Sequence, residues 1–350
     1  MESASVIPTR GVRSFPQSAF RLWRVSALIL LSLEFARVAK AQSCSTADDM
    51  DAAVHTAMTN AAKHDFDLLA RGDSAALRQT AIPSLASNFS GIENAIKDNQ
   101  PNFASQSATP RSVFLLKLEG AAASPRAEFL CGVFGSKGQT ANSAEFVIPN
   151  LPPGTYGIAI LDVATAKGPF TVSFVLQQLG ADWKLGGLYI KDGQIGGHDG
   201  NWFSEKARAY KSKGQNRNAW LYYLEARELL VPVPFMYTQV TDKLYDESQA
   251  IKPSDLPADG AIVDLPGNGK TYKLTSLFPL PVGKDFDLVV KYQAADVSNT
   301  GQTFQENVAV MKALVSKFPE LRDAFDGVVA RAVEPSGKDY GSMLPMKEIK

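Results

Sequence analysis

The order of apolar and polar residues predicts helices at the start of the folded chain. Met50, Val54 and Met58 recur at a spacing of four residues, which is typical of an amphipathic helix. Gly72 follows at a position suited to end that helix, because glycine tolerates the backbone conformation that closes a helix. Apolar residues at helical spacing continue to about residue 102, and they predict one or two shorter helices.

From residue 112 the apolar period changes to two, which is the spacing of strands. Six short segments between residues 112 and 192 are rich in aromatic and β-branched residues and are separated by turn residues, so each is predicted to be a strand. The short connections favour antiparallel neighbours, because parallel strands need longer crossovers. Residues 46–200 are therefore predicted to form an α+β domain, with the helices on one face of an antiparallel sheet.

A resemblance to a known family accompanies this pattern. A long helix that ends in "LLARGD", followed by strands that close on "GADWKLGGLYIKDG", resembles the nuclear-transport-factor-2-like (cystatin-like) α+β roll. The resemblance implies a strongly curved sheet that wraps a helix and encloses a conical pocket. The segment "NLPPGTYGIAI" is instead similar to a turn and strand of transthyretin-like β-sandwiches, but the preceding helices favour the roll.

Residues 201–232 return to helical spacing and predict two helices joined by a turn. The segment is similar to one tetratricopeptide unit, with small residues where the two helices cross. A single unit cannot bury its apolar face alone, and stable arrays need about three repeats. We therefore expect an appended helical hairpin that packs on its own sheet domain and acts together with the N-terminal roll. The matching positions are Ala207, Tyr210, Gly214, Ala219, Tyr223, Ala226 and Leu229.

The remainder of the chain predicts a linker and a second, smaller domain. Residues 233–260 include a long polar stretch and are predicted to be a linker. Residues 261–350 again show strand segments around one helical segment, which predicts a smaller α+β domain of no recognised family. Thr303, with a glutamate three residues later, is predicted to cap that helix. Asp285 and Asp287 alternate along a strand and are expected to be solvated.

Residues 1–41 have the three parts of a secretory signal peptide. A basic leader precedes an apolar run of nine residues, and the small-residue site Ala39-Lys40-Ala41 follows, which together predict export and cleavage near residue 41. The apolar run is far shorter than the ~20 residues that span a bilayer as a helix. Without the leader the chain has 30 basic and 34 acidic side chains, a formal net charge of −4. A mildly acidic protein without basic clusters is a poor candidate for binding nucleic acid or anionic membranes.

The chain has two cysteines, Cys44 and Cys131. In an oxidising compartment they could pair and tie the N-terminal segment to a strand, but two separate thiols are an equal alternative. Cys44 also lies where a lipid could be attached after a lipoprotein signal, which would give an anchored product instead of a freely exported one, periplasmic or secreted. Such signals normally have leucine where this chain has Ala41, and this difference disfavours lipidation.

The segment from Asp264 to Thr271 contains Gly-Asn-Gly-Lys-Thr, which is similar to the end of a phosphate-binding loop. The full motif has a glycine five residues before Gly269, where this chain has Asp264, and it needs a helix after the loop. The residues after Thr271 have a strand pattern instead. Gly267-Asn268-Gly269 is therefore predicted to be a tight turn between two strands, and neither a nucleotide nor another cofactor is expected.

No residue pattern predicts a metal site or a catalytic residue. His55 and His64 are nine residues apart on a predicted helix, which places them on opposite faces. His198 and Asp199 are the one conceivable ligand pair, but the favoured interpretation is a helix start with Asn201 as its capping residue. An acid–base role for His64 or His198, each with the aspartate that follows it, has no partner motif to support it.

The sequence thus predicts an exported, non-enzymatic protein that binds a small ligand or a partner protein. Alternation places Trp183, Leu185 and Tyr189 on one face of the last strand of the N-terminal sheet. Tyr156, Trp183 and Tyr189 are therefore the candidate lining of a ligand pocket that faces the helices. The competing interpretation is that the three aromatic residues are ordinary core residues.

Two other functions remain open. The first is a structural or assembly role in the cell envelope, in which Trp202, Trp220 and Tyr222 of the hairpin form an exposed patch and contact a partner. The second is a hydrolase or isomerase that uses the pocket implied by the roll family. The sequence specifies neither the ligand or partner nor the oligomeric state.

Overall fold

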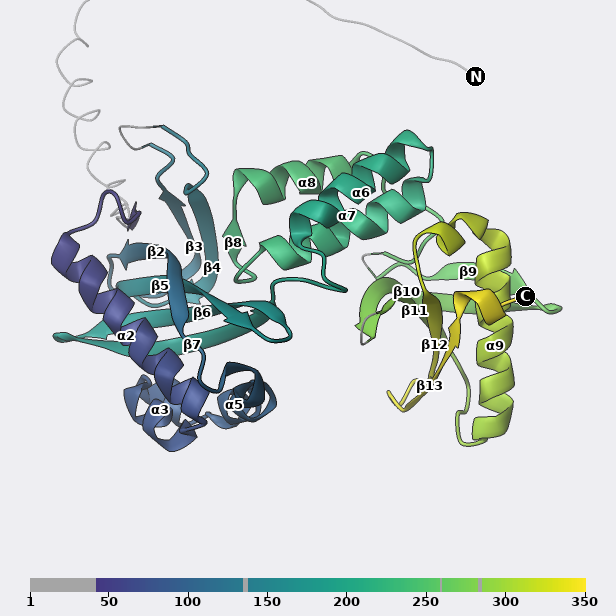
Figure 1. Cartoon of the computed structure of the whole chain (residues 1–350), viewed down its shortest axis with the longest axis horizontal. Coiled ribbons are helices and arrows are strands. Elements are labelled where there is room, and N and C mark those ends of the chain that lie inside the picture. The colour runs from purple at the N-terminus through teal and green to yellow at the C-terminus, as the bar shows by residue number, and fades with distance from the viewer. Residues whose placement is uncertain (1–41, 135–137, 259, 283–284) are drawn as a thin grey trace, which may run out of the picture. The chain divides into compact units, whose positions relative to one another are not determined.

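The structure, a computed structural model, describes residues 42–134, 138–258, 260–282 and 285–350. The predicted signal peptide, residues 1–41, lies outside the described residues. Within them the chain forms eight α-helices and three sheets (Figure 1), so the predicted α+β class is confirmed. None of the helices in the described part is long and apolar enough to cross a membrane.

The first helical layer begins where the sequence predicts it. Helix α2 spans Ala52–Arg71 and is capped by Asp51, whose carboxylate accepts hydrogen bonds from the backbone N–H groups of Ala53 and Val54. Gly72 ends the helix with φ of 72°, a left-handed conformation that glycine adopts without a Cβ clash. Three shorter helices follow: α3 (Ser74–Thr80), α4 (Pro83–Ala86) and α5 (Ser90–Phe103).

The first sheet has the strand order β1-β2-β5-β6-β7, and all of its neighbouring strands are antiparallel. Successive side chains of a strand point to opposite faces, and apolar residues occupy both faces of the central strands. The sheet therefore needs a cover on each side. Its strands are β1 (Gln42–Ser45), β2 (Ala108–Leu118), β5 (Gly154–Thr165), β6 (Gly168–Leu179) and β7 (Asp182–Asp192).

Both faces of this first sheet are covered. The helical layer packs on one face, where the ring of Phe103 meets that of Phe170 at 5.2 Å between centroids. A second, small sheet covers the other face, where the rings of Phe114 and Phe146 lie 5.0 Å apart. The strands of the second sheet are β3 (Ser124–Cys131), β4 (Ala144–Leu151) and β8 (Met236–Tyr237).

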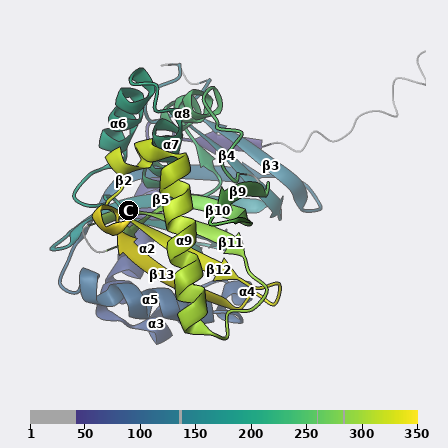
Figure 2. The ribbon, with the colours of Figure 1, turned by 90° about the vertical axis from the view of Figure 1, so that its right-hand side faces the viewer.

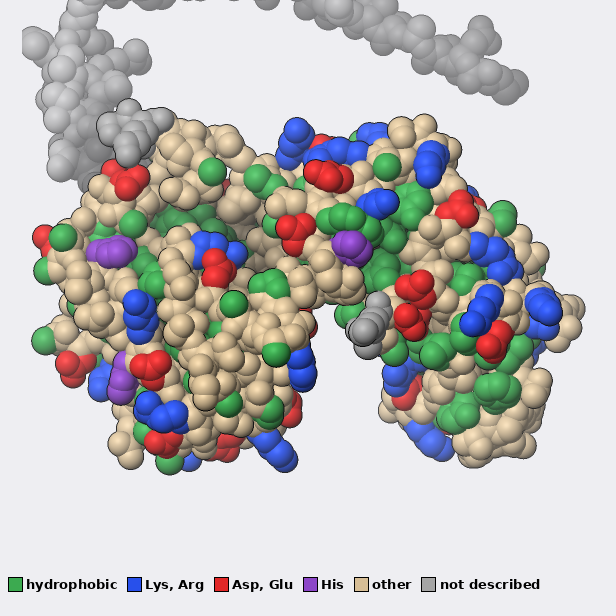
Figure 3. Space-filling model, in the orientation of Figure 1, with side chains coloured by type: hydrophobic (Ala, Val, Ile, Leu, Met, Phe, Trp, Pro, Cys, Tyr) green, Lys and Arg blue, Asp and Glu red, His purple; other side chains and the backbone are tan. Residues whose placement is uncertain are grey.

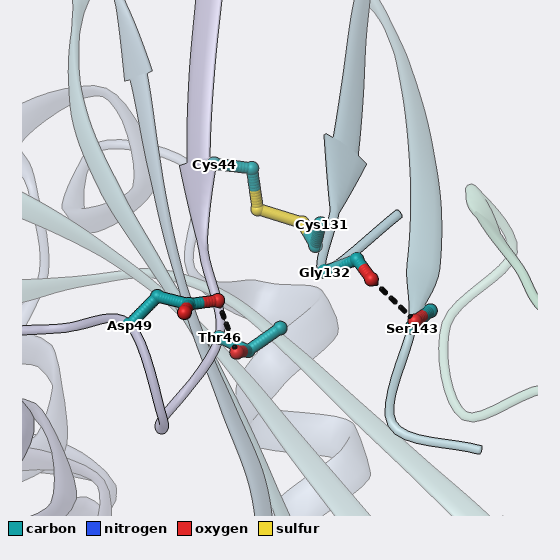
Figure 4. Close-up of a disulfide and its surroundings, with 6 residues drawn as sticks. All are labelled: Cys44, Thr46, Asp49, Cys131, Gly132 and Ser143. Carbon is teal, nitrogen blue, oxygen red and sulfur yellow. Dashed lines mark hydrogen bonds between the residues drawn. A yellow bond between two sulfur atoms is a disulfide. The ribbon is translucent and has the colours of Figure 1, made fainter. Parts of the chain in front are cut away.

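A disulfide between Cys44 and Cys131 joins β1 to the end of β3 (Figure 4). Hydrogen bonds hold the segments beside it: the Thr46 hydroxyl donates to Asp49, and the Ser143 hydroxyl donates to the carbonyl of Gly132. Of the two alternatives that the sequence left open for the cysteines, the structure shows the disulfide. A lipid thioether at Cys44 would need the same sulfur atom, so the disulfide and lipid attachment exclude each other.

The predicted helical hairpin consists of α6 (Gly200–Ser212) and α7 (Asn216–Leu230), with Gly214 in the left-handed turn between them. Its buried aromatic residues belong to the same core as the C-terminal sheet. The Tyr222 hydroxyl donates to the carbonyl of Ala324 at 2.6 Å. This hydrogen bond joins α7 to the segment that precedes β12. The expectation that the hairpin belongs with the N-terminal roll is therefore corrected, because most residues of the core around its aromatic side chains come later in the sequence. Two earlier residues also contact the hairpin: His198 stacks on Trp202, and Lys191 of β7 donates to carbonyls at the end of α7.

Residues 233–260 are more ordered than the predicted linker. They contribute β8 to the second sheet and form helix α8 (Gln239–Gln249), which begins with a capping box between Thr238 and Thr241. Leu244 is the one aliphatic residue of α8 that is buried, together with two small polar residues. A helix with so little apolar periodicity gives a weak sequence signal, which explains why the segment resembled a linker.

The C-terminal sheet has the strand order β13-β12-β11-β10-β9. Strands β11 and β12 are parallel and are connected through helix α9, which runs across one face of the sheet (Figure 2). The helix is capped by Asn299, one residue before its start, and not by Thr303 as predicted. The elements are β9 (Val263–Gly267), β10 (Lys270–Val282), β11 (Asp285–Gln293), α9 (Thr300–Lys317), β12 (Gly327–Val333) and β13 (Asp339–Pro345).

The Gly-Asn-Gly segment is a hairpin turn. Gly267 pairs with Lys270 across it, and Asn268 and Gly269 both have positive φ, 50° and 75°, as the tight turns of two-residue hairpins require. The residues that follow form strand β10, so no helix start faces this turn. The geometry agrees with the predicted turn and differs from that of a phosphate-binding loop.

Candidate functional site

The structure does not bring the three aromatic residues of the predicted N-terminal pocket together. Tyr156 and Tyr189 lie on the face of the first sheet that the small second sheet covers, whereas Trp183 packs on the helical face. The Tyr156 hydroxyl donates to the carbonyl of Pro152 at 2.8 Å, and the Tyr189 ring packs edge-on against Phe235. All three side chains therefore take part in packing.

A β-bulge in β7 explains why the prediction that Trp183, Leu185 and Tyr189 share one face is wrong. Val175 of β6 pairs with Gly187, and the next residue, Leu176, pairs with Leu185, so β7 has one extra residue at this point. An extra residue moves every later side chain to the opposite face. Tyr189 consequently lies on the face opposite to Leu185.

The aromatic residues of the hairpin do not form the predicted exposed patch. Trp220 and Tyr222 are each 5% exposed and belong to the core shared with the C-terminal sheet. Trp202 is partly buried and stacks on the ring of His198, with 3.7 Å between centroids. Asp199, not Asn201, caps α6 by accepting a hydrogen bond from the backbone N–H of Trp202. The pair His198 and Asp199 is thus used for packing and capping.

Two buried carboxyl groups have raised pKa values. Burial raises the pKa of Asp65 to about 6, although the Thr80 hydroxyl and the positive charges of His64 and Lys184 act against this rise. Burial also raises the pKa of Glu225 to about 7. Asp65 belongs to α2 and Glu225 to α7, where the charge of Glu228 adds to the rise. Within the described residues no group of three or more His, Cys, Asp or Glu side chains could hold a metal ion.

The strongest candidate site is a cavity of about 720 Å³ at the end of the C-terminal sheet. Its volume falls within the range of ~300–1,000 Å³ that is usual for small-molecule sites. The start of β10, the end of β11, the end of β12 and the first turns of α9 contribute its walls. The polar side chains among its lining residues are Lys270, Thr271, Tyr272, Lys273, Thr275, Tyr292, Gln293, Glu306 and Glu334.

Tyr272 is the unusual residue of this cavity. The side chain is 4% exposed, and its buried hydroxyl oxygen has no hydrogen-bond partner in the described part of the protein. Burial raises the pKa of this hydroxyl; the charge of Lys270 acts against the rise and that of Glu306 adds to it. Leaving a buried hydroxyl unpaired costs about 1–3 kcal/mol. Tyr272 is among the residues that line the cavity, and the retained, unpaired hydroxyl of such a residue is a candidate ligand contact.

Tyr292 lies beside Tyr272, but its hydroxyl has a hydrogen-bond partner. The two rings meet edge-on, with 5.7 Å between centroids. The Tyr292 hydroxyl donates to Oδ1 of Asn307 at 2.9 Å, and the amide of Asn307 donates in turn to the hydroxyl of Ser342. The core thus satisfies one of two neighbouring tyrosine hydroxyls and leaves the other unpaired.

The charged side chains around the cavity are balanced and mostly paired. Lys270 forms an ion pair with Glu306 at 2.7 Å, and its ammonium group also lies 4.9 Å from the centre of the Tyr272 ring. Lys273 pairs with Asp264 at 2.7 Å. The carboxylate of Glu334 accepts hydrogen bonds from the backbone of Val297 and from the hydroxyl of Ser336. The lining therefore offers no excess charge of either sign.

Sequence reasoning missed this cavity. The strand pattern after the tight turn places Tyr272 and Leu274 on the same side of β10, but nothing in the sequence shows that Glu306 of α9 approaches Lys270. This approach depends on how the helix crosses the sheet. The one available signal was a tyrosine close to the start of a predicted strand, directly after a turn.

Comparison of the chain with protein-family models, with curated proteins and with solved structures finds no match. The resemblances to the α+β roll and to a tetratricopeptide unit therefore stay predictions.

Proposed function

We propose that this is an exported protein that binds a small, uncharged, hydroxyl-rich molecule in the cavity beside Tyr272, without transforming it. The unpaired, buried Tyr272 hydroxyl is the observation that carries the proposal. A ligand hydroxyl can accept from or donate to it, which would remove the energetic cost of leaving it unpaired. The predicted leader at residues 1–41 and the disulfide between Cys44 and Cys131 support export.

The remaining polar groups of the cavity support an uncharged ligand. Lys270 and Lys273 already pair with carboxylates, so little positive charge remains for a phosphate or a carboxylate ligand. Thr271, Thr275 and Gln293 contribute hydroxyl and amide groups that both donate and accept. A molecule with several hydroxyl groups offers the same mixture of donors and acceptors.

The wider surface also supports a small-molecule role over nucleic-acid binding. On the face that Figure 3 shows, Lys and Arg side chains are interspersed with Asp and Glu side chains. Nucleic-acid binding needs positive charge gathered along one surface.

Calorimetric titration of the purified protein against a panel of small molecules tests the proposal. The panel should contain neutral mono- and disaccharides, polyols, sugar phosphates and dicarboxylates. We expect binding from the neutral, hydroxyl-rich group. Binding confined to the phosphates or dicarboxylates would contradict the assigned ligand class, and an unchanged affinity in the Tyr272→Phe variant would contradict the assigned site.

Two matched variants separate binding from folding. Tyr272→Phe removes only the unpaired oxygen, so we expect it to leave the ligand-free protein as stable as before or more stable, by up to about 1–3 kcal/mol, while weakening ligand binding. Tyr292→Phe removes a hydroxyl that bonds to Asn307, so we expect it to destabilise the protein by about 1 kcal/mol. Thermal unfolding of each variant, with and without ligand, measures both effects.

A further inference from the structure

A second hollow of the C-terminal region lies beside helix α9 and shares no lining residue with the cavity beside Tyr272. It is an open groove of about 1160 Å³, which exceeds the range of ~300–1,000 Å³ that is usual for small-molecule sites. Strand β9 and the turn after it, helix α9, and the segments at Arg322 and Lys350 contribute its lining. We call it the α9 groove.

The charged side chains of the α9 groove are mainly basic. Asp264 is the one acidic residue in its lining, as far as the structure describes the chain, and its carboxylate already pairs with Lys273 at 2.7 Å. Lys350, the last residue of the sequence, combines an ammonium group with a terminal carboxyl group and adds no net charge. Three exposed cations remain, and they are Lys312, Lys317 and Arg322.

None of these three cations forms an ion pair within the described residues. The Lys317 ammonium group donates to the backbone carbonyl of Asp264 at 3.2 Å. The Arg322 guanidinium group donates to the carbonyls of Met346 and Ile349 at 3.0 and 2.6 Å. Carbonyl groups carry no net charge, so these bonds hold the two side chains in place and leave their positive charges without a paired carboxylate. Both side chains are therefore positioned in advance for an anionic group.

The neighbouring cavity has the opposite arrangement. There Lys270 pairs with Glu306, and Lys273 pairs with Asp264. Unpaired cations gathered around one groove create a local positive potential that attracts anionic groups, even though the chain without its leader has a formal net charge of −4. The α9 groove and the cavity therefore suit ligands of different charge.

The lining of the α9 groove is also partly apolar, so a fitting occupant needs more than negative charge. An occupant that fills the groove covers these apolar side chains and gains from their burial. A peptide can offer carboxylates and apolar side chains on the same short stretch of chain. The apolar lining residues include Val308, Ala309 and Ala313 of α9, with Pro266 and Pro319.

Strand β9 is an edge strand, but its free edge is poorly suited to pair with a partner strand. Gly267 pairs with Lys270 across the two-residue turn, so the backbone groups of Asp264 and Pro266 point away from β10. Pro266 has no N–H to donate, and the carbonyl of Asp264 already accepts from Lys317. Proline and lysine on an edge strand are usual means of preventing strand addition. A peptide in the α9 groove must therefore be recognised through its side chains.

We propose that the α9 groove binds an acidic segment of a partner protein, in which carboxylates are interspersed with small apolar side chains. The carboxylates contact Lys312, Lys317 and Arg322, and the apolar side chains cover the apolar lining. Arg322 uses two of its five N–H groups within the chain, so others remain for a carboxylate. An acidic polysaccharide would meet the charges but would leave the apolar lining uncovered.

Fluorescence anisotropy of labelled peptides with the full chain tests this proposal. Two probes of about 12 residues contain glutamate, alanine and valine, one with glutamates at strand spacing and one at helix spacing. In the reference peptides glutamine replaces every glutamate. We expect at least one glutamate peptide to bind about tenfold or more tightly than its reference at low salt, and its affinity to fall as salt screens the exposed charges.

A matched pair of charge reversals places the site. Lys312 makes no hydrogen bond or ion pair in the described residues and is exposed, so Lys312→Glu should fold, which circular dichroism checks. It should weaken peptide binding about tenfold or more, because it brings like charges together. Lys63→Glu is the control: Lys63 is also an exposed helical lysine, but on α2, and its reversal changes the net charge equally. We expect this control, and Tyr272→Phe in the separate cavity, to leave the affinity unchanged.

Four outcomes would overturn the proposal. The first is no binding of either glutamate peptide up to about 1 mM, and the second is equal affinity for the glutamate and glutamine peptides. The third is an equal effect of Lys312→Glu and Lys63→Glu, which would show attraction by the net charge and not by the groove. The fourth is tighter binding of an acidic polysaccharide, with polygalacturonate as the probe, which would contradict the assigned class of partner.

Discussion

The two large sheets of this protein use their faces in different ways. The N-terminal sheet is covered on one face by helices and on the other by a small sheet, and its cores contain phenylalanine rings from every layer. In the C-terminal sheet the helices cover one face, and on the other face Leu280, Val282 and Met343 are exposed although Val289 is buried. The N-terminal sheet thus uses the apolar residues of both faces for packing, whereas the C-terminal sheet has an unpaired tyrosine hydroxyl on a residue that lines a cavity. The ligand site that we propose therefore lies in the second half of the chain.

The largest expected difference between the two regions comes from the disulfide, which belongs to the N-terminal region alone. Replacing Cys44 and Cys131 by serine opens a loop that spans 87 residues, and the loop-entropy model assigns about 4–5 kcal/mol to a loop of this length. Hydrogen exchange should show faster opening in strands β1 to β7 and little change in β9 to β13. Equal loss of protection in both regions would show that they unfold as one unit. Adding a reductant to the double variant is the control and should have no further effect.

A core truncation should show how much the covered sheet depends on packing. Leu161 of β5 is fully buried against the helical layer. Leu161→Ala should lower the free energy of unfolding by about 3 kcal/mol, because it removes buried methyl groups and leaves a cavity. Urea unfolding, followed by circular dichroism, measures this change. A loss below about 1 kcal/mol would show that the layers around β5 adjust to fill the space.

The buried carboxyl group of the N-terminal region should make its stability depend on pH. The pKa of Asp65 is raised to about 6 from an ordinary value of 3.8, so the folded state binds the proton more tightly than the unfolded state. The stabilising effect of the protonated form is therefore complete below about pH 4 and is lost as pH rises through about 6, by about 3 kcal/mol at most. Asp65→Asn should reduce this dependence. Unfolding of both proteins at pH 4.5 and pH 8 measures it, and parallel pH profiles would contradict the assignment to Asp65.

Much of the fold could be predicted from the sequence, because the spacing of apolar residues and the residue types that favour turns are local properties of the chain. The end of α2 at Gly72, the hairpin turn at Asn268 and the strand on each side of it all follow from short stretches of chain. Where the prediction failed, the cause was an interaction between distant segments. The bulge beside Gly187 reversed the face of Tyr189, and the hairpin aromatics proved to belong with the C-terminal sheet.

The candidate site could not be predicted from the sequence, because it also depends on interactions between distant segments. Tyr272 and Tyr292 look alike in an alternating strand, and only the position of Asn307 on α9 decides which hydroxyl is satisfied. Asp287 was expected to be solvated, yet it is 2% exposed. Its carboxylate packs over Gly327 of the neighbouring strand, where a Cβ would lie only 2.9 Å from Oδ1. Whether an apolar strand residue faces a core or a contact surface is likewise invisible in the period of the strand.

The smallest expected effect completes the comparison between the two sheets. Leu280→Ala makes the same chemical change as Leu161→Ala, but at a residue that is 41% exposed on the face of the C-terminal sheet opposite to the helices. Measured at a concentration at which light scattering shows a monomer, it should change the free energy of unfolding by less than about 0.5 kcal/mol, as is usual for surface positions. A loss close to that of Leu161→Ala would show that another segment of the same chain covers Leu280 in solution. The pair of variants thus tests directly whether the exposed apolar residues of this face stabilise the protein as the buried residues of the N-terminal sheet do.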